Sequence, residues 1–259
     1  MVILLILCLI VTVLWMTGFL LVTDFSVPLR DARRFKNVLV IFPHADDEAI
    51  TCGGFLHRVS RGGSAVTLAL LTKGERGTPN ATIDVSLKDV RMGEAQAVSE
   101  VLGISKLVQE DFGDGALHEK KALLRAFVAT LIEQEKPDLL ITYDLAGLYG
   151  HMDHITCSEI ITELKKNRFP ELPLWYVTFP KRVLARVRLP EHMTTNPHIQ
   201  EKRACTTHKI FIGASVLPKI ISLYTYKSQR ASLKEGIRRL LPIWFFSSMM
   251  LFEYFAEAS

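Results

Sequence analysis

The sequence predicts an α/β fold built on a doubly wound, mainly parallel sheet that is flanked by helices. Two observations predict it: short runs of β-branched and aliphatic residues alternate with longer segments of helical periodicity, and Gly or Pro ends several of those segments. A third observation concerns residues 2–22, which carry no charge and are long enough to cross a bilayer as one helix. We therefore expect one N-terminal transmembrane helix in front of a single α/β domain.

The first half of the domain is predicted to alternate two strands with two helices. Val, Ile and Leu dominate the two strand segments, and Gly62-Gly63 and Gly103 directly follow the two helical ones. Glycine is favoured after a helix because it adopts the left-handed conformation of a C-cap without a Cβ penalty. The expected strands are 38–42 and 65–71, and the expected helices are 48–61 and 85–102.

The second half continues the alternation and gives the fold its Rossmann-like layout. Pro137 ends one helical segment and precedes an apolar run that is short enough for a buried strand. The expected strands are 106–108, 139–142 and 175–179, and the expected helices are 119–136 and 151–166. The apolar tail 240–255, in which Glu253 is the only charge, leaves two interpretations open: a helix packed in the core, or an interfacial segment beside the N-terminal helix.

The sequence divides into a transmembrane anchor (1–23), a juxtamembrane linker (24–36) and an α/β domain (37–259). A cleaved signal peptide is the rival to the anchor, but nothing basic precedes the apolar run and no A-x-A pattern follows it. The positive-inside rule then predicts that the α/β domain lies on the cytoplasmic side. The basic residues that follow the run are Arg30, Arg33, Arg34 and Lys36.

Composition excludes some functions. The net charge is +4, and no Lys/Arg run is interleaved with aromatics, so we expect no nucleic-acid partner. The four cysteines form no CxxC pair, which excludes a zinc ribbon or a thioredoxin-like motif and favours reduced thiols.

Two polar clusters stand out, each just after a predicted strand. Residues 43–48 read PHADDE and residues 150–154 read GHMDH. In an open α/β sheet, ligands bind outside the carboxyl ends of the strands, so the two clusters can face one another there. Together they offer imidazole and carboxylate groups for a divalent metal, with others left for proton transfer.

Each cluster alone has an ordinary explanation. An Asp-Asp pair at a helix start usually caps the helix, Glu48 suits the same position, and an HxxH spacing by itself is a weak signal. The occurrence of both clusters at two strand ends makes the functional interpretation the stronger one.

The two motifs, in this order and spacing, resemble those of the LmbE-like family of metal-dependent deacetylases, which includes N-acetylglucosaminyl-phosphatidylinositol de-N-acetylase (PIG-L). The likeness covers roughly residues 37–230, and the chain departs from the family pattern at Ala45, where proline is usual. Further matching pieces are Cys52-Gly53-Gly54, residues 71–75, Arg91 with Glu94, and Ser228-Gln229.

The resemblance implies that His44, Asp47 and His154 bind a divalent metal, most often zinc, although this donor set also suits Fe²⁺. It implies that Asp46 is the general base that takes a proton from the attacking water.

Five further roles follow from the resemblance or from position in the loops. A protonated His151 would support the tetrahedral intermediate or donate to the leaving amine, and Asp153 would orient an imidazole. Tyr149 would hydrogen-bond the oxyanion, and Arg91 would hold a polar part of the substrate. Asp114 would bind a sugar hydroxyl, unless it is only a turn residue.

The function expected from these motifs is hydrolytic de-N-acetylation of an N-acetylglucosamine conjugate. The anchor favours a lipid-linked substrate resembling N-acetylglucosaminyl-phosphatidylinositol and a membrane location. Two alternatives remain: the same chemistry on a soluble thiol-sugar or secondary metabolite, and an inactive membrane-anchored sugar-binding module. The presence of both Asp46 and His151 argues against the inactive module.

Overall fold

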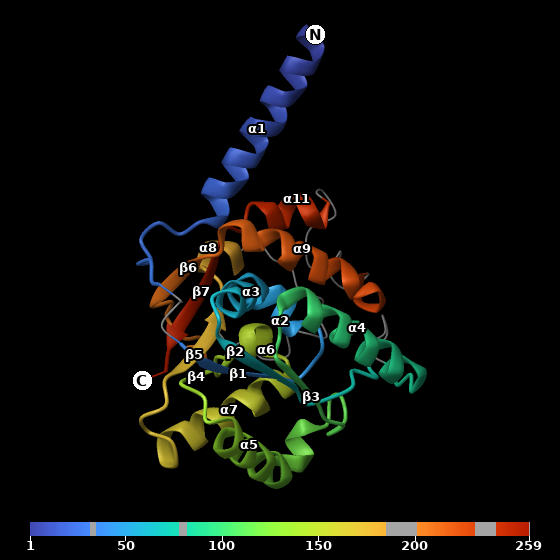
Figure 1. Cartoon of the computed structure of the whole chain (residues 1–259), viewed down its shortest axis with the longest axis vertical. Coiled ribbons are helices and arrows are strands. Elements are labelled where there is room, and N and C mark those ends of the chain that lie inside the picture. The colour runs from blue at the N-terminus through green and yellow to red at the C-terminus, as the bar shows by residue number, and fades with distance from the viewer. Residues whose placement is uncertain (32–34, 78–81, 185–200, 231–241, 259) are drawn as a thin grey trace.

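The computed structural model describes a layered α/β body from which one long helix projects (Figure 1). The described residues are 1–31, 35–77, 82–184, 201–230 and 242–258. Arg33 and Arg34, two of the charges on which the predicted topology depends, lie outside this set, as do the first two residues of the apolar tail.

The sheet has seven strands in the order β3-β2-β1-β4-β5-β7-β6. The first five along the chain run parallel, as predicted, and β7 and β6 add an antiparallel edge. The strand order reverses between β1 and β4, which places a topological switch point at their carboxyl ends. The strands are β1 (Asn37–Phe42), β2 (Ala65–Leu70), β3 (Lys106–Gln109), β4 (Leu139–Tyr143), β5 (Leu174–Thr178), β6 (His208–Phe211) and β7 (Phe252–Glu257).

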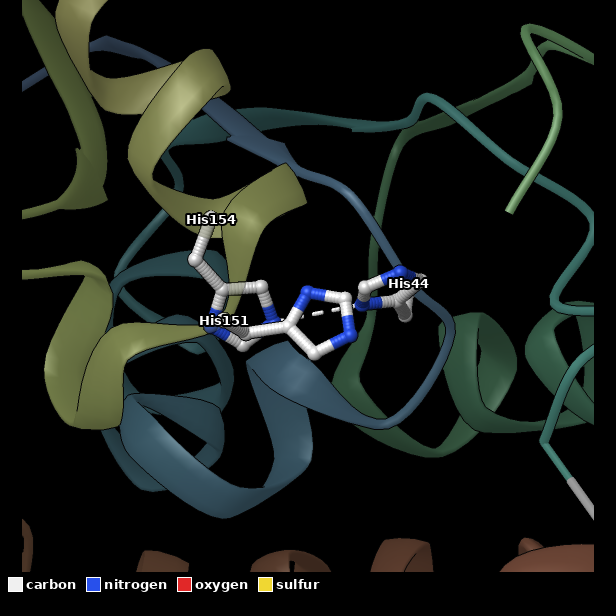
Figure 2. A group of neighbouring side chains, drawn as sticks. All are labelled: His44, His151 and His154. Carbon is white, nitrogen blue, oxygen red and sulfur yellow. Dashed lines mark hydrogen bonds between the residues drawn. The ribbon is translucent and has the colours of Figure 1, made fainter. Parts of the chain in front are cut away.

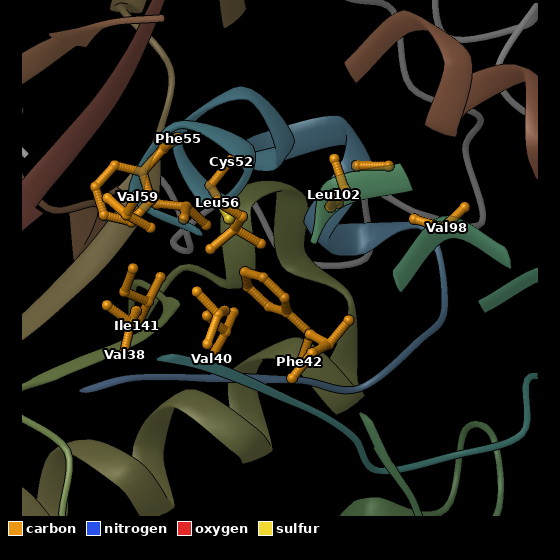
Figure 3. Close-up of a cluster of buried hydrophobic side chains, with 14 of the residues drawn as sticks. Val38, Val40, Phe42, Cys52, Phe55, Leu56, Val59, Val98, Leu102 and Ile141 are labelled. Atoms are coloured by element: carbon orange, nitrogen blue, oxygen red, sulfur yellow. The ribbon is translucent and has the colours of Figure 1, made fainter. Parts of the chain in front are cut away.

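Helices cover both faces of the sheet because alternate residues of the central strands point to opposite sides. Val38, Val40 and Phe42 of β1 pack toward α3, α4 and α9, and Figure 3 shows part of this core. Leu39 and Ile41 pack toward α5 and α7 on the other face. The helices of the body are α2 (Asp47–Thr51), α3 (Gly53–Arg61), α4 (Ser86–Leu102), α5 (Lys121–Glu135), α6 (Gly147–Gly150), α7 (Met152–Asn167), α8 (Lys181–Leu184), α9 (Val216–Thr225) and α11 (Ile243–Ser248), with short 3-10 turns at Leu117–Lys120, Gly213–Ser215 and Lys227–Gln229.

The single helix predicted over 48–61 is wrong in one respect, since the chain breaks it at Cys52 into α2 and α3. The amides of Gly54 and Phe55 donate to the two carboxylate oxygens of Glu253, at 2.9 and 2.6 Å. A carboxylate at the start of α3 satisfies amides that a continuous helix would bond internally. The break therefore comes from a residue some 200 positions away in sequence.

The apolar tail is only partly helical, so neither expected form describes it fully. Its described residues form α11 and then β7, which pairs with both β5 and β6. Glu253 is buried within β7, where Lys219 Nζ lies 2.6 Å from its Oε1. The one charge of the tail is thus neutralised by a buried partner and by the start of α3.

Residues 2–22 form one helix, α1 (Val2–Val22), as predicted. It is long and apolar enough to cross a membrane, by length and composition alone. Residues 24–30, expected as part of a linker, instead lie against the body: Lys209 Nζ donates to the carbonyl of Asp24 at 2.6 Å, and the amide of Arg30 donates to the carbonyl of Lys209.

Candidate metal and acid–base site

Both sequence clusters meet at the switch point between β1 and β4. His44 lies in the loop after β1, whereas His151 and His154 lie at the start of α7, which follows the loop after β4. Figure 2 shows the three imidazoles converging, with His44 Nδ1 3.2 Å from His154 Nε2. The sheet topology thus unites side chains about a hundred residues apart in the sequence.

Neighbouring oxygens determine which imidazole nitrogens face each other. Asp153 Oδ2 and Asp114 Oδ1 lie 3.2 and 3.0 Å from His44 Nε2, so this nitrogen carries a proton and donates. His154 Nδ1 lies 3.2 Å from the carbonyl of Gly147, which can only accept. The lone pair of His154 Nε2 therefore points at His44 Nδ1, and something positive must lie between the two nitrogens.

In the metal-free molecule that positive charge is a proton. Although burial opposes protonation, the carboxylates of Asp114, Asp153 and Asp47 raise the pKa of His44 well above its usual range. Burial, with His151 and His44 nearby, holds the pKa of His154 well below its usual range. A divalent cation would displace the proton on His44 and take both lone pairs.

Asp47 completes a three-donor set with these imidazoles. Its Oδ1 lies 3.5 Å from His154 Nε2, and its Oδ2 lies 3.7 Å from His44 Nδ1. Ligands about 2.0–2.1 Å from a tetrahedral metal are separated by roughly 3.3 Å, close to these values. Tyr143 donates to Asp47 Oδ1 at 2.7 Å and holds the carboxylate in place. The three residues therefore lie close enough together for one divalent metal to contact all of them, and their role as ligands stays a prediction.

His151 adds a second possible donor combination. A ligand atom of each of His44, His151 and His154 lies within 4.8 Å of the others, and the same holds for His44, Asp114 and Asp153. His151 Nδ1, however, accepts a hydrogen bond from the amide of Asp153 at 3.2 Å and caps α7. A ring whose Nδ1 accepts carries its proton on Nε2, so this nitrogen can donate a hydrogen bond. The doubly protonated His151 expected from the resemblance could not accept at Nδ1 in this way.

Asp46 has the surroundings of an acid–base group. Burial raises its pKa to about 7, although the guanidinium of Arg91, whose Nη2 lies 3.8 Å from Oδ1, acts in the opposite direction. Its φ of 110° is one that non-glycine residues rarely adopt. Glu48 Oε2 accepts from the amide of Asp46 at 3.3 Å, in agreement with the capping role expected of Glu48. Asp46 thus faces Arg91, whereas the neighbouring Asp47 faces His44 and His154.

Tyr149 and its loop approach the site from the β4 side. The Tyr149 ring lies 5.1 Å from the His154 ring, and burial together with Asp47 and Asp46 raises its pKa well above the usual range. The hydroxyl therefore stays protonated and can donate a hydrogen bond. Leu148, which precedes it, has a φ of 63°.

Two predicted substrate-binding residues are committed to contacts within the protein. Arg91 is buried and donates to the carbonyls of Ala45 and Gly74. Its bond to Ala45 holds the backbone of the first motif in place. Asp114 is also buried; it contacts His44 through Oδ1 and accepts from the amide of Arg76 through Oδ2. These contacts make Asp114 a partner of the His44 imidazole, beside Asp153.

Asp144 contributes to the site but was not assigned a role from the sequence. Its buried carboxylate accepts from the amides of Ala146 and Leu148 in its own loop and from Ala204 in a distant segment. Arg203 donates to the carbonyl of Leu148 at 2.7 Å. The only sequence signal was a carboxylate at the end of β4, which is also the pattern of an ordinary turn.

Residues 39–165 match a family model described as GlcNAc-PI de-N-acetylase, PIG-L. This segment, about half of the chain, belongs to the PIG-L family. The matched segment contains both motifs and the predicted site residues from His44 to His154. The predicted family is thereby confirmed.

Two curated relatives agree with this assignment. A diacetylchitobiose deacetylase of Thermococcus kodakarensis is 34% identical over 137 residues, covering 51% of this chain and 49% of that protein. A 1D-myo-inositol 2-acetamido-2-deoxy-alpha-D-glucopyranoside deacetylase of Corynebacterium diphtheriae is 30% identical over 177 residues, 58% of this chain and 59% of that protein. The chain thus spans about half the length of the curated relatives it matches.

Among solved structures, the N,N'-diacetylchitobiose deacetylase from Pyrococcus horikoshii superposes with a TM-score of 0.64. The superposition covers 92% of this chain and 88% of that one at 19% identity. At this identity the likeness shows the fold, and it confirms the predicted α/β class with a mainly parallel sheet.

Proposed function

We propose that this PIG-L family protein is a metal-dependent hydrolase that removes the acetyl group from an N-acetylglucosamine conjugate. The observation that carries the proposal is the pair of imidazole nitrogens, His44 Nδ1 and His154 Nε2, held 3.2 Å apart beside Asp47. Their other nitrogens are engaged by carboxylate or carbonyl oxygens, which is the usual outer support of metal-binding histidines.

The proposed metal is Zn²⁺, with Fe²⁺ as the alternative for the same three donors. His44, Asp47 and His154 would hold it, and when bound it would act as a Lewis acid toward water and the acetamide carbonyl. A comparison of acetate release after loading with each ion in turn distinguishes the two metals.

The remaining residues divide the proton transfers and the charge stabilisation. Asp46 accepts a proton from the attacking water, a role suited to a carboxylate whose pKa lies near 7. Tyr149 donates from its hydroxyl to the developing oxyanion, and His151 donates from Nε2 toward the leaving amine. Asp153 and Asp114 keep the proton of His44 on Nε2, away from the metal side.

The substrate proposed for the site is lipid-linked, like N-acetylglucosaminyl-phosphatidylinositol, because α1 is long and apolar enough to tether the chain beside such a lipid. The alternative is a soluble N-acetylglucosamine conjugate. Two matched relatives favour it, since they are deacetylases of diacetylchitobiose and of a glucosaminyl-inositol.

An acetate-release assay on the full chain in liposomes tests both candidates. We expect metal-dependent release from N-acetylglucosaminyl-phosphatidylinositol to exceed, in kcat/KM, the release from the soluble N-acetylglucosaminyl-inositol. Membrane concentration of both partners is worth about 10²–10⁴-fold when it acts as effective molarity. Faster turnover of the soluble conjugate would support the alternative, and release from neither would contradict deacetylation itself.

We also propose that the catalytic body lies on the cytoplasmic side of the membrane. The motivation is the excess of basic residues after α1, among them Arg30 and Lys36. Protease added to sealed, right-side-out vesicles should leave the body intact, and detergent should expose it to cleavage. Cleavage of the body before detergent is added would place it on the opposite side.

A further inference from the structure

The last third of α1 does not project freely, because it lies beside α11 and the start of β7. Trp15 Nε1 donates to Ser248 Oγ at 2.9 Å. Gly18 lies against Met249 so closely that a Cβ there would lie 2.1 Å from the thioether sulfur. The rings of Phe19 and Phe252 have centroids 6.3 Å apart. Residues 248–252 are therefore level with residues 15–19 of α1.

This contact determines how deep α11 would lie if α1 spans a bilayer, as the proposed membrane function requires. An α-helix rises about 1.5 Å per residue, so Gly18 and Trp15 lie roughly 6 and 10 Å inward from Val22 at the end of the apolar run. Ser248 and Met249 are at the same level. Interfacial helices bury their apolar faces about 5–10 Å into the boundary of headgroups and acyl chains.

The composition of this surface suits that depth. No charged residue occurs from 242 to 252, and Trp244 on α11 is 52% exposed. On α9, which packs beside α11 in Figure 1, Leu217 and Ile221 are 61% and 53% exposed. Their spacing of four places them on one side of the helix. Tryptophan is enriched at the interface between membrane and water because its ring is amphipathic.

We propose that α11 and the exposed side of α9 form an interfacial membrane-binding surface, which enters the same leaflet as the C-terminal end of α1. The occupant is the lipid bilayer, since the surface is continuous with the helix that crosses it. The body then has two attachments to the membrane, the span and this surface. Together they fix the orientation of the catalytic site relative to the lipid headgroups.

Tryptophan quenching in liposomes tests the surface with the full chain. Trp244→Phe is compared with the wild type, so that their difference isolates Trp244 from Trp15 and from the core residue Trp175. We expect Trp244 to lose most of its fluorescence with lipids brominated near the headgroup, and less with lipids brominated near the chain end. The tryptophan of Leu217→Trp, made in the Trp244→Phe background, should likewise be quenched more by lipids brominated near the headgroup than by lipids brominated near the chain end.

Leu123→Trp in that background is the matched control, because Leu123 is 65% exposed on α5, across the sheet from α11. It should not be quenched. Trp15→Phe reports separately on the anchor. Quenching of Trp15 but not of Trp244 would contradict the membrane-binding surface while supporting the transmembrane anchor. Quenching of neither tryptophan would contradict both. Acetate release from a soluble conjugate tests the enzyme activity independently of all these variants.

Discussion

Replacing Asp46 by asparagine is expected to lower kcat by about 10²–10⁴-fold, the usual contribution of a general base, while the metal content stays at one equivalent. The amide has nearly the same shape but cannot accept a proton. Retained metal would show that the loss is chemical, and elemental analysis of the purified variant measures it. A kcat near that of the wild type would mean that the base is elsewhere, and Asp153 would be the next candidate.

The pH profile gives a second test of the same residue. Burial raises the pKa of Asp46 to about 7 in the metal-free protein, and a nearby divalent cation would favour the carboxylate and lower it. A base must be deprotonated to act, so kcat/KM should fall as the pH falls through the pKa, with the acidic limb at or below pH 7. In Asp46→Asn this limb should disappear. A wild-type kcat/KM that increases as the pH falls below 7, or an acidic limb that persists unchanged in Asp46→Asn, would contradict the assignment.

Loss of a metal ligand should have the other large effect. We expect Asp47→Ala and His154→Ala to weaken metal binding by more than the roughly 10–100-fold typical of changes to residues that only support a ligand. Asp153→Asn, which removes a carboxylate oxygen near His44 Nε2, should fall within that range. Titration with the metal ion, followed by calorimetry, measures all three.

His151→Ala is the matched control for the metal series. Its ring lies 4.9 Å from that of His154, so it belongs to the same cluster, yet its Nδ1 already accepts from the amide of Asp153. We expect it to keep its metal affinity and lose activity. If Asp47→Ala keeps its full metal affinity and His151→Ala loses it, the three-histidine donor set would be favoured instead.

Local sequence signals were sufficient for the parallel core. The strands β1, β2, β4 and β5 are continuous apolar runs bounded by glycine, proline or polar residues, and they were predicted to within a residue or two at their ends. Elements buried on both faces have this composition wherever they occur, so no knowledge of their neighbours was needed.

Elements that depend on distant partners could not be found in the same way. Residues 252–257 are apolar enough for a helix or a strand, and they form β7 because β5 and β6 offer unpaired edges. The break at Cys52 likewise depends on Glu253, and the role of Arg91 depends on the carbonyl of Ala45. A short sequence window contains no record of such partners.

By itself, the sequence determined the fold class, the family, the apolar helix α1 and the residue types at the site. Only the tertiary structure decided how those residues are used: which nitrogen of His44 faces Asp153, which carboxylate is held near a pKa of 7, and what lies beside α11. The physical reason is that residue type sets the possible chemistry, whereas protonation, burial and depth depend on groups brought together only by folding.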